Sequence, residues 1–446
     1  MTRQLASLSL ATAPKWIGGF SLGFTMAFAS VSAAEPREST GLEASTSSEL
    51  DAVMAGVRAD RPNNDLSLGG ILYPHLHIFS AYGYSTAPDG SLAVNDHDPQ
   101  RSATLQGFEP GISLRAGKLQ GFANATGITD SDGDFSFTLE EGFLKLVDLP
   151  LDLQIRGGQY LNRIGFQNSV HNHGWMYVDQ NLVNGRFLNE GELITQGGEV
   201  SWNVPLSMMQ ASVISASVGR VQSHDHGHGE EEHGEESEFE GEGANFTDTI
   251  VSAVWVNQYD IDDMNRLTGV LSGVWGDNEF GRTSQVYGVG FEYLWRENGY
   301  GVGGDSLRWR NELMYRHFGA VSGHLPGEEE EDHHDEEDHH DEDEHGHNEE
   351  EGGHRASLDE FGLYSSLVYG FDDRLEAGLR AGWVSGISEA GLDDRVRLSP
   401  TLTWYANEAR TVQARLQYNW DHADDFGSEH SVWFQLGVNF GGAHVR

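Results

Sequence analysis

The chain has 446 residues, contains no cysteine and carries a formal net charge of −43. Its acidic balance excludes a basic nucleic-acid-binding protein, and the lack of cysteine excludes a disulfide-stapled scaffold. A chain of this length would suggest two or three soluble domains. However, no linker or change of composition divides its core, which favours one large closed sheet.

The first 34 residues (1–34) are predicted to be a secretory signal peptide. Arg3 and Lys15 give a positively charged start, an apolar stretch covers 17–29, and the small residues around Ala33 suit cleavage. The alternative is an N-terminal membrane anchor, but the apolar stretch is shorter than the roughly 20 residues that a spanning helix needs. A mature protein resident in a membrane would therefore cross it with strands.

Residues 35–69 lack the pattern of the later sequence, and we expect them to form a periplasmic or lumenal extension. They are too few to form the plug domain of an energised receptor. We therefore expect no TonB-coupled mechanism.

From Gly70 onward, apolar and polar residues alternate in segments of about ten residues. The clearest segment is 412–420, in which every second residue is apolar. This period of two is typical of a β-strand with one apolar and one polar face. In a soluble sandwich the apolar face points to a core, whereas in an outer-membrane barrel it meets lipid and the polar face lines water. The signal peptide, the aromatic strand ends and the terminal strand ending at Phe440 favour the barrel.

We therefore predict an all-β fold, a transmembrane antiparallel β-barrel over 70–440 with about 16 strands, followed by a tail at 441–446. The predicted strands are 71–84, 104–114, 119–129, 135–147, 151–161, 193–203, 209–221, 247–258, 264–276, 283–295, 306–318, 357–369, 374–385, 394–405, 410–421 and 431–440. The three longest connections, 162–192, 222–246 and 319–356, all follow odd-numbered strands. This asymmetry predicts long extracellular loops and short periplasmic turns.

Two of these loops, 222–246 and 319–356, are of low complexity and rich in histidine and acidic residues. Imidazole and carboxylate ligands suit zinc, copper and nickel, and close histidine spacing lets two rings reach one ion. The predicted metal ligands are His224, His226, His228, His233, His324, His333, His334, His339, His340, His345, His347 and His354. The alternative is a solvated acidic surface, which would need no histidine.

The third long connection, 162–192, follows the fifth predicted strand. In trimeric sixteen-strand porins the corresponding loop folds into the lumen and narrows it. By that analogy, the candidates for a pore constriction are Arg163, His171, His173, Asp179 and Arg186. The alternative is a loop packed against the inner wall, with the same polar groups satisfied there.

Several arginines fall on the polar face of the predicted strands. The candidates for lining the lumen are Arg308, Arg310, Arg316, Arg380, Arg397 and Arg415. They could form a ladder for anions, or pair with acids such as Glu312 and Glu376. His75 and His77 share one strand face and could be ligands or hydrogen-bonded lumenal residues. No nucleophile elbow, phosphate-binding glycine loop or zinc-protease motif occurs, so we predict no enzyme and no catalytic residue.

The stretch 150–205 contains a distinctive set of motifs, which includes Gly165-Phe166, His171-Asn172-His173, Trp175, Asp179, Leu182-Val183-Asn184-Gly185-Arg186 and Trp202. With these residues the stretch resembles a group of porin-like proteobacterial outer-membrane proteins with His/Asp/Glu-rich loops, distantly similar to phosphate-selective porins and associated with zinc supply. The resemblance implies a porin-like barrel in the outer membrane of a Gram-negative bacterium and a link to zinc.

We therefore expect a passive channel for divalent metal, with Zn²⁺ as the transported or loop-bound ion and no catalytic cofactor. One alternative is an anion porin of the phosphate type, in which the arginines select. Another is a surface metal buffer or adhesin that the barrel only anchors. The expected partners are outer-membrane lipid and divalent metal ions, without nucleic acid, and a homotrimer is one expected assembly.

Overall fold

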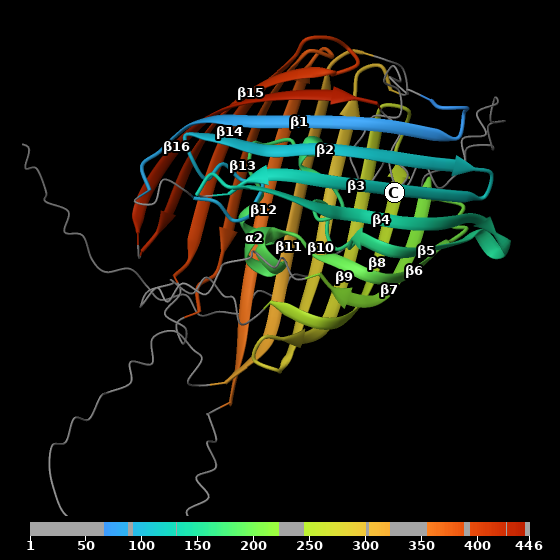
Figure 1. Cartoon of the computed structure of the whole chain (residues 1–446), viewed down its shortest axis with the longest axis horizontal. Helices are drawn as coiled ribbons and strands as arrows, with labels where there is room; N and C mark the ends of the chain where they lie inside the picture. The colour runs from blue at the N-terminus through green and yellow to red at the C-terminus, as the bar shows by residue number, and fades with distance from the viewer. Residues whose placement is uncertain are drawn as a thin grey trace, which may run out of the picture. The chain divides into compact units, whose positions relative to one another are not determined.

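The computed structural model describes residues 67–87, 92–130, 132–222, 245–299, 303–321, 355–387, 393–424 and 426–441. These residues form a closed antiparallel β-barrel in which each strand pairs with its neighbours in the sequence (Figure 1). The last strand pairs with the first and closes the ring. The prediction of an all-β antiparallel barrel is confirmed.

Among the described residues, the sixteen strands are β1 (Leu72–Ser85), β2 (Ala103–Ala116), β3 (Leu119–Thr129), β4 (Phe135–Leu149), β5 (Leu153–Leu161), β6 (Ile194–Asn203), β7 (Ala211–Val221), β8 (Phe246–Asp260), β9 (Asn265–Asn278), β10 (Thr283–Arg296), β11 (Ser306–Val321), β12 (Arg355–Phe371), β13 (Leu375–Val384), β14 (Arg395–Tyr405), β15 (Val412–Ala423) and β16 (Gly427–Phe440). The helical turns are η1 (Pro150–Asp152), η2 (Asn172–Gly174), α2 (Leu182–Phe187) and η3 (Asn189–Gly191). Within these ranges, every helix is too short or too polar to span a bilayer.

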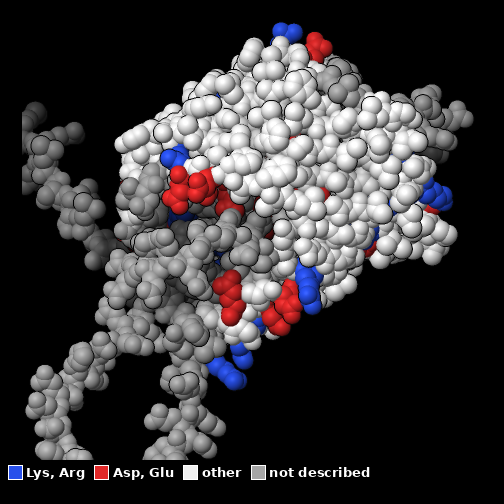
Figure 2. Space-filling model, in the orientation of Figure 1, with Lys and Arg blue, Asp and Glu red and all other residues white. Residues whose placement is uncertain are grey.

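Strand β15 shows how the alternating sequence is used. From Val412 to Asp421 its polar residues are buried inside the barrel, and the apolar residues between them are exposed or half-buried. Leu416 is 51% exposed, whereas the neighbouring Arg415 is 2% exposed. In Figure 2, the broad face of the barrel carries few Lys, Arg, Asp or Glu side chains, and most of those visible lie towards its margins. A soluble protein does not expose so continuous an apolar surface, but the lipid-facing wall of a barrel does.

The predicted strands agree with the observed ones to within a few residues. The largest difference is at β16, which begins at Gly427, four residues before the predicted start at 431, because Glu429 pairs with Asp421 of β15. The hydrogen-bonded pairing of β16 therefore begins several residues before the alternation of apolar and polar residues begins. Strand β5 begins after η1, in which Leu151 has a φ of 67°.

The antiparallel order places all connections of one kind at the same end of the barrel. We call the end at which odd-numbered strands finish the loop end, and the opposite end the turn end. The connections 86–102, 162–193, 222–245 and 322–354 join strands at the loop end, and 117–118 joins β2 to β3 at the turn end. That the loop end faces the outside of the cell stays a prediction.

Candidate functional site

The connection between β5 and β6, residues 162–193, lies inside the barrel, and we call it the interior loop. Six of its apolar side chains pack against inward-facing residues of distant strands in one buried cluster. The cluster contains Ile164, Leu182, Val183, Phe187, Leu188 and Leu193 of the interior loop, with Val274, Val286, Met314, Tyr364 and Val384 among the strand residues. Helix α2 of this loop lies against β12 and β13 (Figure 1). The interior loop therefore crosses the lumen and is held by a small core of its own.

Local sequence explains how this loop fits. The Asn181 side chain accepts a hydrogen bond from the backbone N–H of Asn184 (2.9 Å), which is the usual cap at the start of a helix. Glycines on the inner face of the strands make room for bulky loop residues. A Cβ atom at Gly290 would lie 2.4 Å from the ring of Phe166. Part of the high glycine content therefore serves the packing of the interior loop.

Asp179 fastens the interior loop to strands β13, β14 and β15. Its carboxylate accepts hydrogen bonds from Arg380 (2.5 Å), Arg397 (3.1 Å), Gln417 (2.7 Å) and Asn419 (2.8 Å). Burial alone raises the pKa of the Asp179 carboxyl, but the two guanidinium groups outweigh burial and hold the pKa below its ordinary value. Asp179 is therefore a charged and fully engaged latch.

Two further ion pairs hold the interior loop near its ends. Arg163 donates to Glu199 of β6 (3.0 Å). Arg186 of α2 donates to Glu360 of β12 (2.9 Å), and Glu360 also accepts a hydrogen bond from Nε of Arg316 (2.6 Å). His171 and His173 also have little exposed surface, so the five residues predicted to form a constriction all lie in the barrel interior. That they set the narrowest part of a pore stays a prediction.

The six arginines predicted to line the lumen are also in the interior, and each is engaged by other protein groups. Arg310 donates to Glu292 (2.8 Å), and Nε of Arg308 lies 3.8 Å from the same carboxylate. Arg415 donates to two backbone carbonyls of the interior loop, at 2.8 Å each. Arg316, Arg380 and Arg397 take part in the ion pairs described above. These guanidinium groups are therefore bound within the protein.

The acids expected to pair with the lumenal arginines have further partners as well. Glu312 accepts a hydrogen bond from the backbone N–H of Phe166 (3.1 Å), and Glu376 pairs with Arg410 (2.5 Å). Glu312 also interacts electrostatically with Arg310, and Glu376 with Arg415, as the sequence predicted in kind. The alternation of a strand gives the face on which a side chain lies and not the group that it meets across the lumen.

The wall formed by β1, β2 and β4, which β16 separates from β15, holds histidines and glutamates in the interior. We call them the imidazole–carboxylate cluster, which consists of His75, His77, Glu109, Glu140, Glu141, His171 and His173. His171 is fully buried, with Nδ1 2.8 Å from Oε1 of Glu140 and Nε2 2.8 Å from Oε2 of Glu141. Nδ1 of His173 lies 2.6 Å from Oε2 of Glu109. The residues come from β1, β2, β4 and the interior loop.

The imidazole rings of this cluster follow one another along the wall. The ring centroids of His171 and His173 are 5.6 Å apart, those of His173 and His77 are 3.8 Å apart, and those of His77 and His75 are 5.5 Å apart. Oε1 of Glu109 is buried and makes no hydrogen bond within the described part of the chain. The cluster is therefore a continuous row of nitrogen and oxygen atoms inside the barrel that could act as metal ligands.

Sequence reasoning singled out the four histidines of the cluster but not its glutamates. Glu140 and Glu141 are consecutive and both are buried, because a β-bulge interrupts the pairing of β3 and β4. A signal was present in the sequence. The exposed apolar residues of β4 occupy odd positions from 135 to 139 and even positions from 144 to 146. This change of phase marks the bulge and the inward turn of both acids.

The histidine-rich parts of 222–246 and 319–356, with all twelve predicted metal ligands, lie outside the described residues. Their metal binding stays a prediction. The strands that these connections join, β7 with β8 and β11 with β12, meet at the loop end.

Comparisons with known sequences give little. No family model matches the chain. A protein of Aquifex aeolicus described as uncharacterized is 36% identical over 69 residues, which cover 16% of this chain. The aligned segment spans only 14% of the length of that relative.

Comparisons of structure find outer-membrane proteins. OprB of Pseudomonas putida is 8% identical, with a TM-score of 0.50, over 83% of this chain and 94% of that one. The anion-selective porin of Comamonas acidovorans is 8% identical, with a TM-score of 0.49, over 83% of this chain and 99% of that one. At such low identity, the likeness to OprB shows the fold alone. The chain has the closed sixteen-strand barrel found in outer-membrane porins.

Proposed function

We propose that this chain is a porin-type channel of the Gram-negative outer membrane that lets divalent metal ions, zinc first among them, pass down their gradient. No energy coupling is part of the proposal. The exposed apolar wall of the barrel supports a location in lipid, and a homotrimer in the membrane is a further part of it.

The observation that carries the proposal is the division of the interior into two kinds of charge. On one side, formed by β13 to β15, the arginines are engaged by carboxylates and backbone carbonyls. On the second side, formed by β1 to β4 beyond β16, buried imidazoles lie beside buried glutamates. Guanidinium does not lose its proton in proteins, whereas an imidazole that loses its proton becomes a ligand for zinc. The second side therefore offers groups that a metal ion can use.

Capture outside the barrel is the second step of the proposal. The histidine and acidic residues of 222–246 and 319–356 supply ligands that suit zinc. Their negative charge would raise the local concentration of divalent cations near the loop end, and more so at low salt. Ordering a chain segment around an ion costs conformational entropy, so we expect each ion to be bound weakly. Weak capture permits release into the lumen.

A channel for anions is the second candidate, because six arginines line the interior. Their engagement by Asp179, Glu292, Glu360 and Asp421 weakens this candidate, since a paired guanidinium attracts an anion less. A surface metal buffer anchored by the barrel is the third. It accounts for the histidine-rich segments but gives no role to the histidines of the interior.

Zinc uptake into liposomes tests the proposal. The purified full-length protein would be reconstituted around a fluorescent zinc chelator, and zinc added outside. We expect fluorescence to rise faster than in protein-free liposomes, and reversal potentials in planar bilayers to indicate cation preference. A variant with the twelve loop histidines replaced by asparagine should take up zinc more slowly at low zinc concentration. Anion preference that zinc does not alter, together with no zinc entry, would overturn the proposal.

A further inference from the structure

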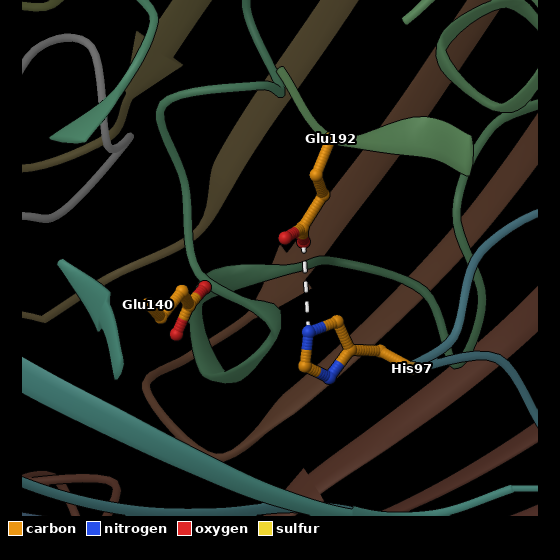
Figure 3. Close-up of side chains that lie close together, drawn as sticks. All are labelled: His97, Glu140 and Glu192. Carbon is orange, nitrogen blue, oxygen red and sulfur yellow. Dashed lines mark ion pairs between the residues drawn. The ribbon is translucent and has the colours of Figure 1, made fainter. Parts of the chain in front are cut away.

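A second group of ligands lies beside the imidazole–carboxylate cluster, nearer the loop end. His97 belongs to the connection between β1 and β2, Glu140 to β4, and Glu192 to the end of the interior loop. One ligand atom from each residue lies within 4.8 Å of the other two, and all three residues are buried. Figure 3 shows the three side chains converging, with Nε2 of His97 3.7 Å from Oε1 of Glu192.

The ring of His97 is oriented as a metal ligand requires. Its Nδ1 lies 2.8 Å from the backbone carbonyl oxygen of Gln106. Because a carbonyl only accepts, Nδ1 carries the hydrogen and Nε2 is left to face the two glutamates. The side chain of Gln106 donates in return to the carbonyl of His97 (2.7 Å). A histidine whose second nitrogen donates to a carbonyl is the common arrangement in metal sites.

Glu140 is also held in place by neighbouring groups. Its Oε2 accepts hydrogen bonds from Nδ2 of Asn124 (3.0 Å) and Oγ1 of Thr126 (2.5 Å). The same pocket is lined by Gln222, whose Oε1 is buried and accepts no hydrogen bond within the described residues. The carboxylate is therefore oriented before any ion arrives, and a further oxygen donor lies at the pocket wall.

We propose that His97, Glu140 and Glu192 form a binding site for one divalent transition metal ion of the zinc class inside the barrel. One imidazole and two carboxylates match the nitrogen and oxygen ligands that zinc takes in proteins. Three protein ligands leave a coordination position for water, which is typical of sites that exchange ligands. None of these three residues was among the metal ligands predicted from the sequence.

The competing occupant of this site is a proton. Burial by itself lowers the pKa of the His97 imidazole, but the charges of Glu192 and Glu140 outweigh burial and raise the pKa to about 9. Without metal, a protonated His97 would pair with the two glutamates. A zinc ion would replace that proton, and its double positive charge would then interact with the same two carboxylates. Both occupants use the same geometry, so a measurement of metal is needed to separate them.

The site is continuous with the row of rings described above. Glu140 is shared, because its Oε1 also lies 2.8 Å from Nδ1 of His171. From His171 the row passes through His173 and His77 to His75, which lies nearer the turn end. That metal ions bind at this site in passing through the barrel is an inference that rests on the proposed function. Metal binding at the site rests only on its own geometry.

Anomalous diffraction from cobalt tests the site. The full-length chain, with the twelve loop histidines replaced by asparagine, would be crystallised with Co²⁺, and binding in detergent followed by the visible absorption of cobalt. We expect an anomalous peak between His97, Glu140 and Glu192, and a stoichiometry that falls by one ion in His97→Ala and in Glu192→Gln. His422→Ala, on β15, is the matched control and should keep the ion.

Folding would be checked for each variant by circular dichroism, and Glu192→Gln, which keeps the shape of the side chain, serves if His97→Ala does not fold. Absence of the peak, or cobalt bound equally by Glu192→Gln, would overturn the site. Zinc flux without metal bound at His97, Glu140 and Glu192 would contradict the proposed site but not the proposed function. Metal bound there without zinc flux would contradict the proposed function but not the proposed site.

Discussion

Two regions of the barrel interior, separated by β16, hold charge in different ways. We call the region on β13 to β15 the arginine side and the region on β1 to β4 the imidazole side. On β13 to β15, Arg380 and Arg397 meet Asp179, and the carboxylate is saturated with hydrogen bonds. On β1 to β4, Glu140 and Glu109 meet imidazoles, which can give up a proton and accept a metal ion. The difference indicates that the arginine side fixes the interior loop, whereas the imidazole side is suited to exchange ions. Each prediction below changes one contact and measures stability together with conductance or zinc entry.

The largest effect is expected for Asp179→Asn. This change leaves Arg380 and Arg397 buried without their shared charge, and breaking a buried ion pair costs about 3–5 kcal/mol. We expect a lower melting temperature, a larger single-channel conductance because the interior loop is released, and a shift towards anion preference. Thermal unfolding in detergent and planar-bilayer recordings measure these changes. Asp262→Asn, in the exposed turn between β8 and β9, should behave like the wild type.

An Asp179→Asn protein with unchanged conductance and stability would show that the apolar cluster alone holds the interior loop. In that case the arginines would be free for another role, and the anion channel would regain support.

The barrel was predictable from the sequence because its wall obeys a simple rule. Every strand must present an apolar face to lipid, so apolar and polar residues alternate with a period of two in each strand, as in 412–420. The largest error in a predicted strand is at β16, where the observed strand begins at Gly427 and so extends beyond the apolar band. At those positions the ladder needs no apolar residue, and the pattern carries no information.

The interior was predictable only in part because its contacts join segments far apart in the chain. The interior loop was anticipated, and so were its Asp179 and His171. The partners were not, since Asp179 meets Arg397 more than two hundred positions away. His97 and Glu192 lie in connections without any periodic pattern, so nothing in the sequence joins them to Glu140.

A smaller effect is expected for Glu360→Gln. Glu360 accepts from both Arg186 and Arg316, so its loss also breaks a buried ion pair. The Arg186 side chain is 13% exposed, so its charge keeps some contact with water, and we expect a loss of stability near the lower end of about 3–5 kcal/mol. Conductance should rise less than in Asp179→Asn, because the Asp179 latch remains. A rise as large as that of Asp179→Asn would place the main latch at α2 instead.

On the imidazole side, His173→Ala tests whether the cluster serves metal passage without holding the loop. It removes the ring stacked on His77 and the hydrogen-bond partner of Glu109. An unsatisfied buried polar group costs about 1–3 kcal/mol, so we expect a moderate loss of stability. Zinc entry into liposomes should slow, while the conductance measured in potassium chloride stays near that of the wild type. His430→Ala, on β16, is the control. If zinc entry and potassium chloride conductance fell by the same factor, His173 would have only a structural role.

The smallest effect is expected for Gly362→Ala, which probes the packing between β12 and the interior loop. A Cβ atom at Gly362 would lie 3.0 Å from a methyl carbon of Val183 and 3.2 Å from the ring of Phe187, so these side chains must give way by a few tenths of an ångström. Overpacking of this size costs about 1 kcal/mol. Gly269→Ala on β9 meets nothing within 4 Å and is the matched control.

We expect Gly362→Ala to lower the melting temperature slightly and to leave zinc entry unchanged, because Val183 and Phe187 belong to the apolar cluster and not to the imidazole side. Gly269→Ala should leave both unchanged or raise stability slightly, since alanine restricts the unfolded chain more than glycine does. If both alanine variants behaved alike, α2 would not be packed closely against β12. The interior loop would then depend on its ion pairs alone, and the loss seen in Asp179→Asn should be correspondingly larger.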